Sequence, residues 1–350
     1  MSAQTVTRGF SPLDEQLDLK ETQWSEGIVK QAVWLSGMVP FEDAAMILQE
    51  IGQEEISTSS VWRLTQKWGQ RLQALERAEQ EQAHRLTEPG EVFRRESRSK
   101  GRMGLSMDGS MIYIRKEDWK ELKVGCLFDV LMLPSVDSQT KDRVELGHAV
   151  HNTYVSHLGG PEEFGRKLWT EAERRHWNRA SDTQVVADGA VWIWNLVQDY
   201  FYDSHPVVDW FHAKEHLALA AQLMFGESSS AAKRWLNDQE TALFQGHAET
   251  IAQIIGKAAE EQVQAEDLLQ QSGYFEKNKR RMNYLELRSE GWVIGSGMVE
   301  SGGKQFKARF CGPGMRWSRS GAENLLPVRT AILSRRFDQR WHAVYNSPIN

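Results

Sequence analysis

Three acidic residues, Asp108, Asp188 and Glu300, stand where side chains could hold metal ions for phosphoryl-transfer chemistry. Asp108 lies between short apolar segments, Asp188 follows the apolar stretch 184–187, and Glu300 opens an expected helix behind a glycine-rich approach. Three carboxylates without a Cys or His framework favour Mg²⁺ or Mn²⁺ as the cofactor. Two such ions can stabilise the attacking and leaving oxygens of a phosphoryl transfer. These three residues are therefore candidate catalytic metal ligands.

Each of these acids is ordinary when it is taken alone. Asp108 and Asp188 both precede a glycine, and an Asp-Gly pair usually marks only a turn. Glu300 alone could be a partner of a helix dipole. Their order along the chain and the elements around them therefore carry the prediction.

The stretch 104–212 predicts a mixed sheet with flanking helices. Strands are expected at 105–107, 111–115, 122–132 and 152–158, with Asp108-Gly109 as a hairpin turn between the first two. A helix over 160–179, a strand over 184–187, a helix over 190–201 and a strand over 206–210 follow. This order predicts an α/β fold (α+β overall) with an RNase H-like core. Carboxylates at strand ends are where open α/β sheets place functional residues.

After residue 212 the strand patterns stop. Helices rich in Ala, Glu, Gln and Leu are expected over 212–225, 229–246 and 248–271, which predicts an all-helical insertion. A helix over 299–310 then carries Glu300. Ser320 with Glu323 forms a capping box that predicts a last helix to about residue 337.

The N-terminal part predicts a helix-turn-helix domain. Residues 1–24 are expected to be an irregular arm, and residues 25–72 read as three short helices with Gly52 ending the second. In a helix-turn-helix the recognition helix lies in the major groove, so Arg63 and Lys67 could face bases or phosphates. A plain helical bundle is the alternative interpretation.

Positive charge is concentrated in two places, although the net charge is −6. Residues 277–350 contain 14 Lys/Arg and 5 Asp/Glu, a local charge of +9, and a second basic run covers 94–102 in an expected linker. Concentrated positive charge attracts phosphate by counterion release, whatever the global sum. The alternative is a solvated charged surface.

The two cysteines, Cys126 and Cys311, fit neither a zinc spacing nor a disulfide framework. The first 24 residues do not resemble a signal peptide, and no apolar run approaches the length of a membrane span. We therefore expect a protein of the reducing cytoplasm that is not associated with a membrane.

Four sequence blocks occur in order along the second half of the chain. They are VADGAVWIWN at 186–195, VDWFHAKEHL at 208–217, GSGMVESGGK at 295–304 and GMRWSRSGA at 314–322. Together they resemble the ISKra-type bacterial insertion-sequence transposases, over about residues 104 to 341. The resemblance implies a Mutator-like DDE enzyme in which Asp108, Asp188 and Glu300 form the catalytic triad.

The resemblance also implies residues around the triad. Many insertion-sequence transposases carry a basic residue seven positions after the Glu, which is Lys307 here, and Lys304 lies one helical turn after Glu300. Either lysine could hold a phosphate, unless both are simply solvent-exposed. Asp209 and His212 fit an Asp-x-x-His signature that resembles one in Mutator-like transposases. His212 could orient the scissile phosphate or Asp209, and a structural hydrogen-bonded pair is the alternative.

The basic C-terminal region supplies further candidates for DNA binding. Trp317 could stack on an unpaired base while its neighbours Arg316 and Arg319 hold phosphates, and Arg309 is a further candidate phosphate contact. The alternative for Trp317 is core packing, because the chain has 14 Trp.

These expectations describe a transposase with six segments. They are an arm (1–24), a helix-turn-helix domain (25–72), a helical and basic linker (73–103), the first part of the catalytic core (104–212), a helical insertion (213–290), and the core completion with the basic C-terminal region (291–350). The expected partners are the terminal inverted repeats, target DNA and further copies of the chain in a dimer or larger assembly. Another RNase H-like nuclease of the resolvase type and a non-catalytic, domesticated DNA-binding protein are the alternatives. A two-carboxylate glycosidase is more distant, because it leaves the basic region unexplained.

Overall fold

The computed structural model describes residues 24–85, 101–136, 142–260 and 265–347. The expected arm and most of the basic run at 94–102 therefore lie outside the described residues. The described chain forms two compact units. One holds the residues up to Glu76 together with those from Trp317 onwards, and the other holds Arg77–Arg316.

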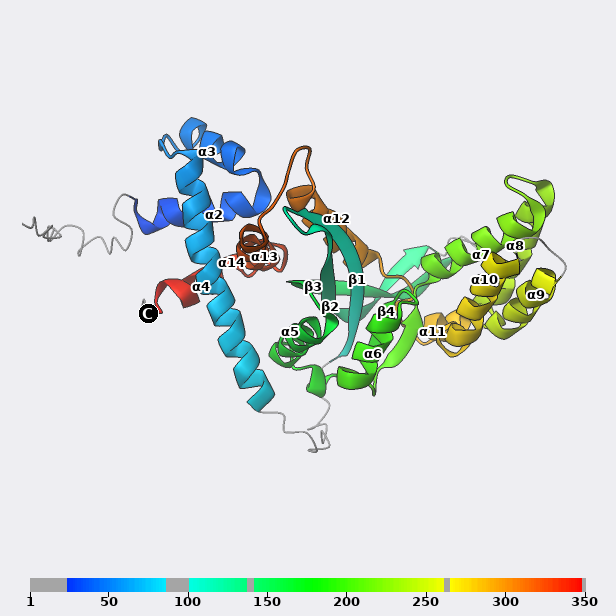
Figure 1. Cartoon of the computed structure of the whole chain (residues 1–350). Coiled ribbons are helices and arrows are strands. Elements are labelled where there is room, and N and C mark those ends of the chain that lie inside the picture. The colour runs from blue at the N-terminus through cyan, green and yellow to red at the C-terminus, as the bar shows by residue number, and fades with distance from the viewer. Residues whose placement is uncertain (1–23, 86–100, 137–141, 261–264, 348–350) are drawn as a thin grey trace, which may run out of the picture. The chain divides into compact units, whose positions relative to one another are not determined.

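The larger unit is built on a five-stranded mixed sheet (Figure 1). Its strands are β1 (Arg102–Ile114), β2 (Asp118–Val136), β3 (Arg143–Leu158), β4 (Thr183–Ala187) and β5 (His205–Val208). The spatial order is β3-β2-β1-β4-β5. β1, β2 and β3 pair antiparallel, whereas β4 and β5 continue the sheet parallel to β1. The mixed α/β fold is confirmed, and the strand order is compatible with an RNase H-like core.

The turn of the first hairpin lies further along the chain than the sequence predicted. Asp108 and Gly109 are inside β1, where they pair with Val124 and Lys123 of β2. The chain reverses after Ile114, where the Glu117 amide donates to the Ile114 carbonyl and Lys116 adopts φ 69°. The expected hairpin turn at Asp108-Gly109 is therefore wrong. Apolar residues continue on both sides of the pair, so thirteen residues form one strand.

Helices cover both faces of the sheet (Figure 1). A Cβ on Gly125 of β2 would collide with Leu168 of α5 (Pro161–Arg174), whereas one on Gly302 of α12 (Gly297–Phe310) would collide with Tyr154 of β3. Successive side chains of a strand point to opposite faces. Gly125 faces α5, so the next residue, Cys126, faces the other side of the sheet. Tyr154 is paired with Cys126 and therefore shares its face, which places α12 on the side opposite α5. Helix α6 (Val191–Tyr200) packs beside α5, with Gly165 close to Leu196.

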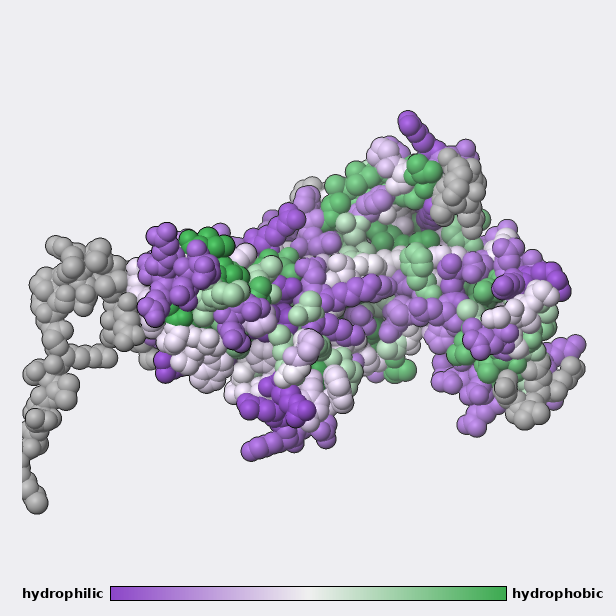
Figure 2. Space-filling model, turned by 90° about the horizontal axis from the view of Figure 1, so that it is seen from above, coloured by the Kyte–Doolittle hydropathy of each residue, from purple (hydrophilic) through white to green (hydrophobic). Residues whose placement is uncertain are grey.

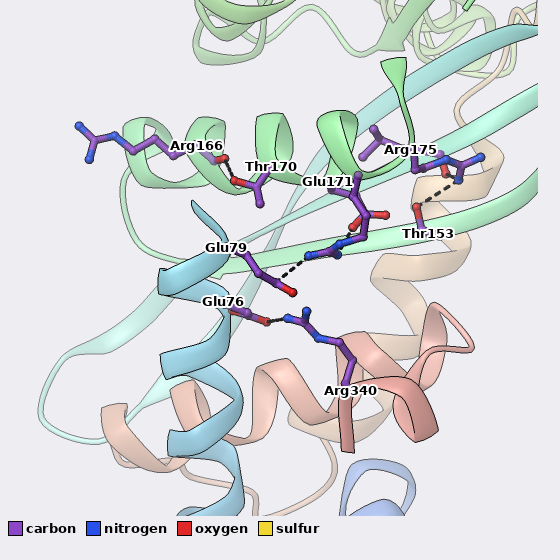
Figure 3. A network of polar contacts seen from close by, with 10 residues as sticks. Glu76, Glu79, Thr153, Arg166, Thr170, Glu171, Arg175 and Arg340 are labelled. Atoms are coloured by element: carbon purple, nitrogen blue, oxygen red, sulfur yellow. Dashed lines mark hydrogen bonds and ion pairs between the residues drawn. The ribbon is translucent and has the colours of Figure 1, made fainter. Parts of the chain in front are cut away.

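Arg175 closes a gap in the pairing of β2 with β3, where the register shifts between Leu127 and Asp129. Its guanidinium donates to the carbonyls of Leu127 (2.8 Å) and His151 (2.6 Å) and to the Thr153 hydroxyl (3.1 Å) (Figure 3). It also forms an ion pair with Asp129 at 2.6 Å, and its side chain is only 8% exposed. The groups that the bulge leaves unpaired are thus satisfied by the residue that follows α5.

Arg174, the last residue of α5, forms one ion pair within its own helix and one with helix α4. Its guanidinium lies 2.5 Å from the carboxylate of Glu171 in α5 and 2.7 Å from that of Glu79 in α4. Figure 3 labels both of these glutamates. Glu171 is buried, and Arg174 supplies a positive charge beside its carboxylate.

The helical insertion forms a bundle beyond β5 (Figure 1). It consists of α7 (Trp210–Phe225), α8 (Ser230–Phe244), α9 (Ala248–Glu260) and α10 (Ala265–Asn278), followed by the short α11 (Tyr284–Ser289). Its core side chains are fully buried: Leu217, Leu243, Ile251, Ile255, Leu268 and Phe275. Figure 2 shows mostly hydrophilic residues on the exposed side of this bundle. The helical character was predicted, but α9 and α10 stand where one helix over 248–271 was expected.

The chain returns from the insertion to the sheet at residues 292–296. Gln184 of β4, which is fully buried, donates its amide to the Val293 carbonyl (2.7 Å) and accepts from the Val293 amide (3.0 Å). The Trp210 amide donates to the Ile294 carbonyl at 2.9 Å. These contacts fix the segment that leads directly into α12 and Glu300.

Replacing Gln184 by Leu is expected to destabilise the protein by about 2–4 kcal/mol, since it leaves the buried Val293 amide and carbonyl without a partner. Chemical denaturation followed by circular dichroism measures this change. Gln198→Leu is the matched control, because Gln198 is exposed on α6. Equal stability of both variants and the wild type would contradict the proposed anchoring role of Gln184.

The smaller unit joins the N-terminal helices to the C-terminal ones. It contains α2 (Glu26–Met38), α3 (Phe41–Glu50), the first part of α4 (Thr58–Arg85), α13 (Arg319–Leu333) and α14 (Phe337–Tyr345). The Asn324 side chain bonds Gln66 and Gln73 of α4, and the Arg329 guanidinium donates to the Gly37 carbonyl at 3.1 Å. Residues 317–350, which the sequence grouped with the core completion, thus lie in the same unit as α2, α3 and α4.

The three N-terminal helices expected from the sequence are present, but a helix-turn-helix is not thereby confirmed. Helix α4 runs for 28 residues without a break near residue 72. Ser318, and not Ser320, caps α13 by accepting from the Gly321 amide, so the predicted capping box at Ser320 is wrong. Arg335 with φ 55° separates α13 from α14, where one helix to residue 337 was expected.

Among the described residues, no helix combines the length and the apolar character that crossing a bilayer requires.

Candidate metal-dependent active site

Strand register brings three aspartates into one row across the sheet. Met107 of β1 pairs with Ala187 of β4, and Ala187 pairs with Val208 of β5. Asp108, Asp188 and Asp209 each follow one of these residues, and neighbouring strands lie about 5 Å apart. The three carboxylates therefore sit at the same level of three adjacent parallel strands.

Helix α12 carries Glu300 to this row. Gly302 and Gly303 lie against the sheet. A Cβ on Gly303 would stand 3.6 Å from the Asp108 carboxylate and 3.4 Å from the Ser110 hydroxyl. Gly303 is thus in ordinary van der Waals distance of β1, whereas Gly302 leaves room for the Tyr154 ring of β3, with which a Cβ there would collide.

Asp108 and Glu300 share a cavity of about 490 Å³. It combines carboxylates, cations and one exposed aromatic ring. Its lining residues are Asp108, Ser110, Phe211, His212, Glu215, Gly297, Glu300, Gly303, Lys304 and Lys307. Asp188 is not among the lining residues, but it acts electrostatically on Asp108, as its effect on the pKa of Asp108 shows.

Burial raises the pKa of Asp108 above its usual value of 3.8. The Gly109 amide, which donates to the carboxylate at 2.7 Å, lowers this pKa. The neighbouring Asp188 carboxylate raises it, whereas His212 and Lys307 lower it. The site therefore concentrates like charge in a partly dehydrated place, an arrangement that a bound cation would relieve.

Asp209 is buried and ties together the elements around the site. Its Oδ1 caps α7 by accepting from the His212 amide at 2.8 Å, and its Oδ2 accepts from the Ser296 amide. The Ser296 hydroxyl in turn donates to Glu300 Oε1 at 3.2 Å. Asp209 therefore positions the start of α7 and, through Ser296, the carboxylate of Glu300. His212 also contacts Glu215, with Nδ1 at 3.3 Å from Oε2.

The donor atoms fit a hard divalent cation. Asp209, His212 and Glu300 offer ligand atoms that all lie within 4.8 Å of one another. Both oxygens of Asp209 also accept backbone amides, one from His212 and one from Ser296. Carboxylate oxygens without any thiolate match Mg²⁺ or Mn²⁺. Asp209, His212 and Glu300 thus form a group that could hold a divalent cation, and neither Asp108 nor Asp188 is part of this group.

Five of the candidate phosphate-binding residues have exposed side chains, and only two of these five line the cavity. Lys304 and Lys307 are exposed on α12 and line the cavity. Arg316 is exposed, with its guanidinium 5.8 Å from the Tyr113 ring centroid, and Arg63 and Lys67 are exposed on α4. Arg319 pairs with Glu323 at 3.3 Å.

Two predicted DNA contacts are corrected by burial. The Arg309 side chain is 2% exposed on the sheet side of α12, so it does not face a phosphate. Trp317 is 8% exposed and meets the Phe41 ring edge-on at 6.1 Å, so it packs inside the smaller unit and offers no face to a base. Although the surrounding sequence is basic, each element there still packs one face against the protein core, and Arg309 and Trp317 lie on that face.

Sequence reasoning missed several residues that the structure places at the site. Ser110 follows Asp108 by two positions and therefore points to the same face of β1. Phe211 is 58% exposed at the cavity, and Glu215 is one turn beyond it on α7. Its position two residues after Asp108 on the same strand could have indicated Ser110. Phe211 and Glu215 lie in the sequence block 208–217, but no sequence pattern indicates a function for either of them.

Comparison with known proteins adds no identification of the chain. No protein-family model matches it, and no curated protein matches it significantly.

Proposed function

We propose that the chain is a DDE-type DNA transposase of a bacterial insertion sequence. The observation that carries this proposal is the row of Asp108, Asp188 and Asp209 on three adjacent strands, with Glu300 brought to it by α12. An acidic site of this kind, next to two exposed lysines, suits the handling of phosphodiesters.

In the proposed reaction, water first breaks the P–O3′ bond at each element end and leaves a 3′-hydroxyl and a 5′-phosphate. The freed 3′-hydroxyl then attacks a target phosphodiester, forming a new P–O bond and releasing a target 3′-hydroxyl. Asp108, Asp188 and Glu300 would hold two Mg²⁺ or Mn²⁺ ions, which supply charge stabilisation for the attacking and leaving oxygens.

Other residues bind and orient the DNA in this proposal. Lys304 and Lys307 hold the phosphates beside the scissile bond, and His212 orients that phosphate or Asp209. The N-terminal helices, with Arg63 and Lys67, bind the terminal inverted repeats as a helix-turn-helix, and Arg316 and Arg319 contact the backbone. Two element ends must be joined together, so the active form is a dimer or larger assembly, working in the cytoplasm at the nucleoid.

The test is incubation of the full chain with Mg²⁺ and a plasmid that carries the element's own ends, together with a target duplex. We expect cleavage at the ends and joined products, both abolished by a chelator and strongly reduced in Asp188→Asn. Equal activity of Asp188→Asn and the wild type would refute the role of Asp188.

The products separate the proposal from its alternatives. Cleavage without joining to the target indicates a resolvase-type nuclease on the same fold. Binding of the repeats without any Mg²⁺-dependent cleavage indicates a non-catalytic DNA-binding protein.

A further inference from the structure

Tyr274, a residue of the helical insertion, lies beside the acidic row. Its ring stacks on the His216 ring of α7, with centroids 3.6 Å apart and planes inclined by 19°. The Gln271 side chain, one turn earlier on α10, contacts His216 Nδ1 at 2.7 Å. The position of the tyrosine ring is therefore fixed from two helices of the bundle.

The ring also packs against the residue that follows Asp188. A Cβ on Gly189 would stand 2.5 Å from Tyr274 Cε2, closer than atoms can approach. Glycine at 189 therefore makes room for Tyr274 directly after the metal-binding aspartate. Tyr274 of α10 thus lies against the residue after Asp188, while Phe211, His212 and Glu215 of α7 line the cavity.

The Tyr274 hydroxyl is buried and has no hydrogen-bond partner among the described residues. Burial raises its pKa well above the usual value, and Asp188, Asp209 and Glu215 raise the pKa further. A tyrosine hydroxyl carries its proton at neutral pH even at its ordinary pKa, so this group is a hydrogen-bond donor. An unused buried donor next to several carboxylates is costly, so a partner is expected in the working state of the site.

Among the three nearby carboxylates, that of Asp188 is best able to accept a hydrogen bond from the Tyr274 hydroxyl. Both Asp209 oxygens already accept backbone amides, and the Glu215 side chain is 75% exposed beside His212. Asp188 uses only Oδ1, which accepts from the Ala190 amide at 2.8 Å. Its Oδ2 accepts no hydrogen bond from the described residues.

We propose that Tyr274 is a positioning residue, whose hydroxyl donates a hydrogen bond to the Asp188 carboxylate and orients it toward a divalent cation. This role rests on the proposed function, since it presumes that Asp188 is a metal ligand. The helical insertion then contributes to metal binding, in addition to any part it has in contacting DNA. Partners that orient a ligating carboxylate typically change metal affinity by tenfold or more.

The test is calorimetric titration of Mn²⁺ alone into the full chain, without DNA. Tyr274→Phe keeps the ring and its stack on His216 but removes the hydroxyl, and we expect about tenfold weaker Mn²⁺ binding. Because the hydroxyl has no partner in the metal-free protein, Tm in the presence of a chelator should not fall. A merely structural role predicts the reverse pattern, a lower Tm with unchanged Mn²⁺ affinity, and would overturn the proposal.

Tyr284→Phe is the matched control. Tyr284 is also a fully buried phenol without a hydrogen-bond partner among the described residues, but it packs on Trp210, and apart from burial its pKa is raised by Tyr274 and Asp209. Its loss should leave Mn²⁺ affinity unchanged.

Asp188→Asn separates failure of this inference from failure of the proposed function. Weak Mn²⁺ binding by Asp188→Asn, with wild-type binding by Tyr274→Phe, overturns the role of Tyr274 alone. Wild-type binding by both variants refutes the metal site itself, and the role of Tyr274 with it.

Discussion

Replacing Asp108 by Asn is expected to reduce Mg²⁺-dependent DNA cleavage by about a thousandfold and to make the metal-free protein more stable. A metal ion supplies several kcal/mol of transition-state stabilisation, and each 1.36 kcal/mol corresponds to a factor of ten in rate. Asparagine offers only one neutral oxygen where the carboxylate offers two charged ones. The loss of activity therefore follows from weaker metal binding at an otherwise intact site.

The gain in stability follows from the surroundings of Asp108. Burial and the Asp188 carboxylate raise its pKa, so its charged form is less favourable in the folded protein than in the unfolded chain. Since the folded state binds the proton more tightly, stability is lost as pH rises from below 3.8 through the raised pKa of the folded protein. The advantage of Asp108→Asn in chelator should thus be present at pH 7 and shrink towards pH 4.

Denaturant titrations in chelator at both pH values, together with cleavage assays in Mg²⁺, check this prediction. Asp199→Asn is the control, because Asp199 is an exposed carboxylate on α6. It should change neither quantity. A fully active Asp108→Asn protein would remove Asp108 from the triad, and a less stable one would contradict the electrostatic account.

Replacing Trp341 by Ala is expected to destabilise the smaller unit by about 3–5 kcal/mol, the usual cost of emptying a large aromatic site. Trp341 is fully buried, and its ring lies 4.4 Å from Trp68 of α4 and 6.1 Å from Tyr345. Its indole N–H donates to Glu26 of α2 at 2.8 Å. The substitution therefore removes contacts that join the C-terminal helix to two N-terminal helices.

Denaturant unfolding followed by circular dichroism measures this loss. Trp62→Ala is the matched control, since Trp62 is 45% exposed on α4, and it should change stability by less than about 0.5 kcal/mol. If Trp341→Ala were as mild as Trp62→Ala, the C-terminal helix would not be part of this core.

Unfolding of the smaller unit in Trp341→Ala should also weaken DNA binding, which a binding assay at fixed salt would reveal.

The elements of the sheet were predictable, because strand and helix patterns are local. The buried strand at 184–187 and the helix over 299–310 correspond closely to β4 and α12. The local pattern at Asp108-Gly109 predicted a turn that is wrong, because this dipeptide lies inside a strand. Pairing with β2 outweighed the local preference there, because it satisfies the backbone of the whole thirteen-residue strand.

By itself, the sequence determined the mixed α/β class, the helical insertion and the identity of the three candidate acids. It did not determine that Asp209 is fully buried between two backbone amides, that Arg309 and Trp317 point inward, or that the Tyr274 ring packs against Gly189. These features depend on strand register and helix packing between residues that are far apart in the chain. Side-chain periodicity reports which face of an element is buried, but it does not specify the partner. The register of β1, β4 and β5 placed the aspartates in one row, and the packing of α12 on the sheet, with Gly302 against Tyr154, brought Glu300 to the cavity that Asp108 lines.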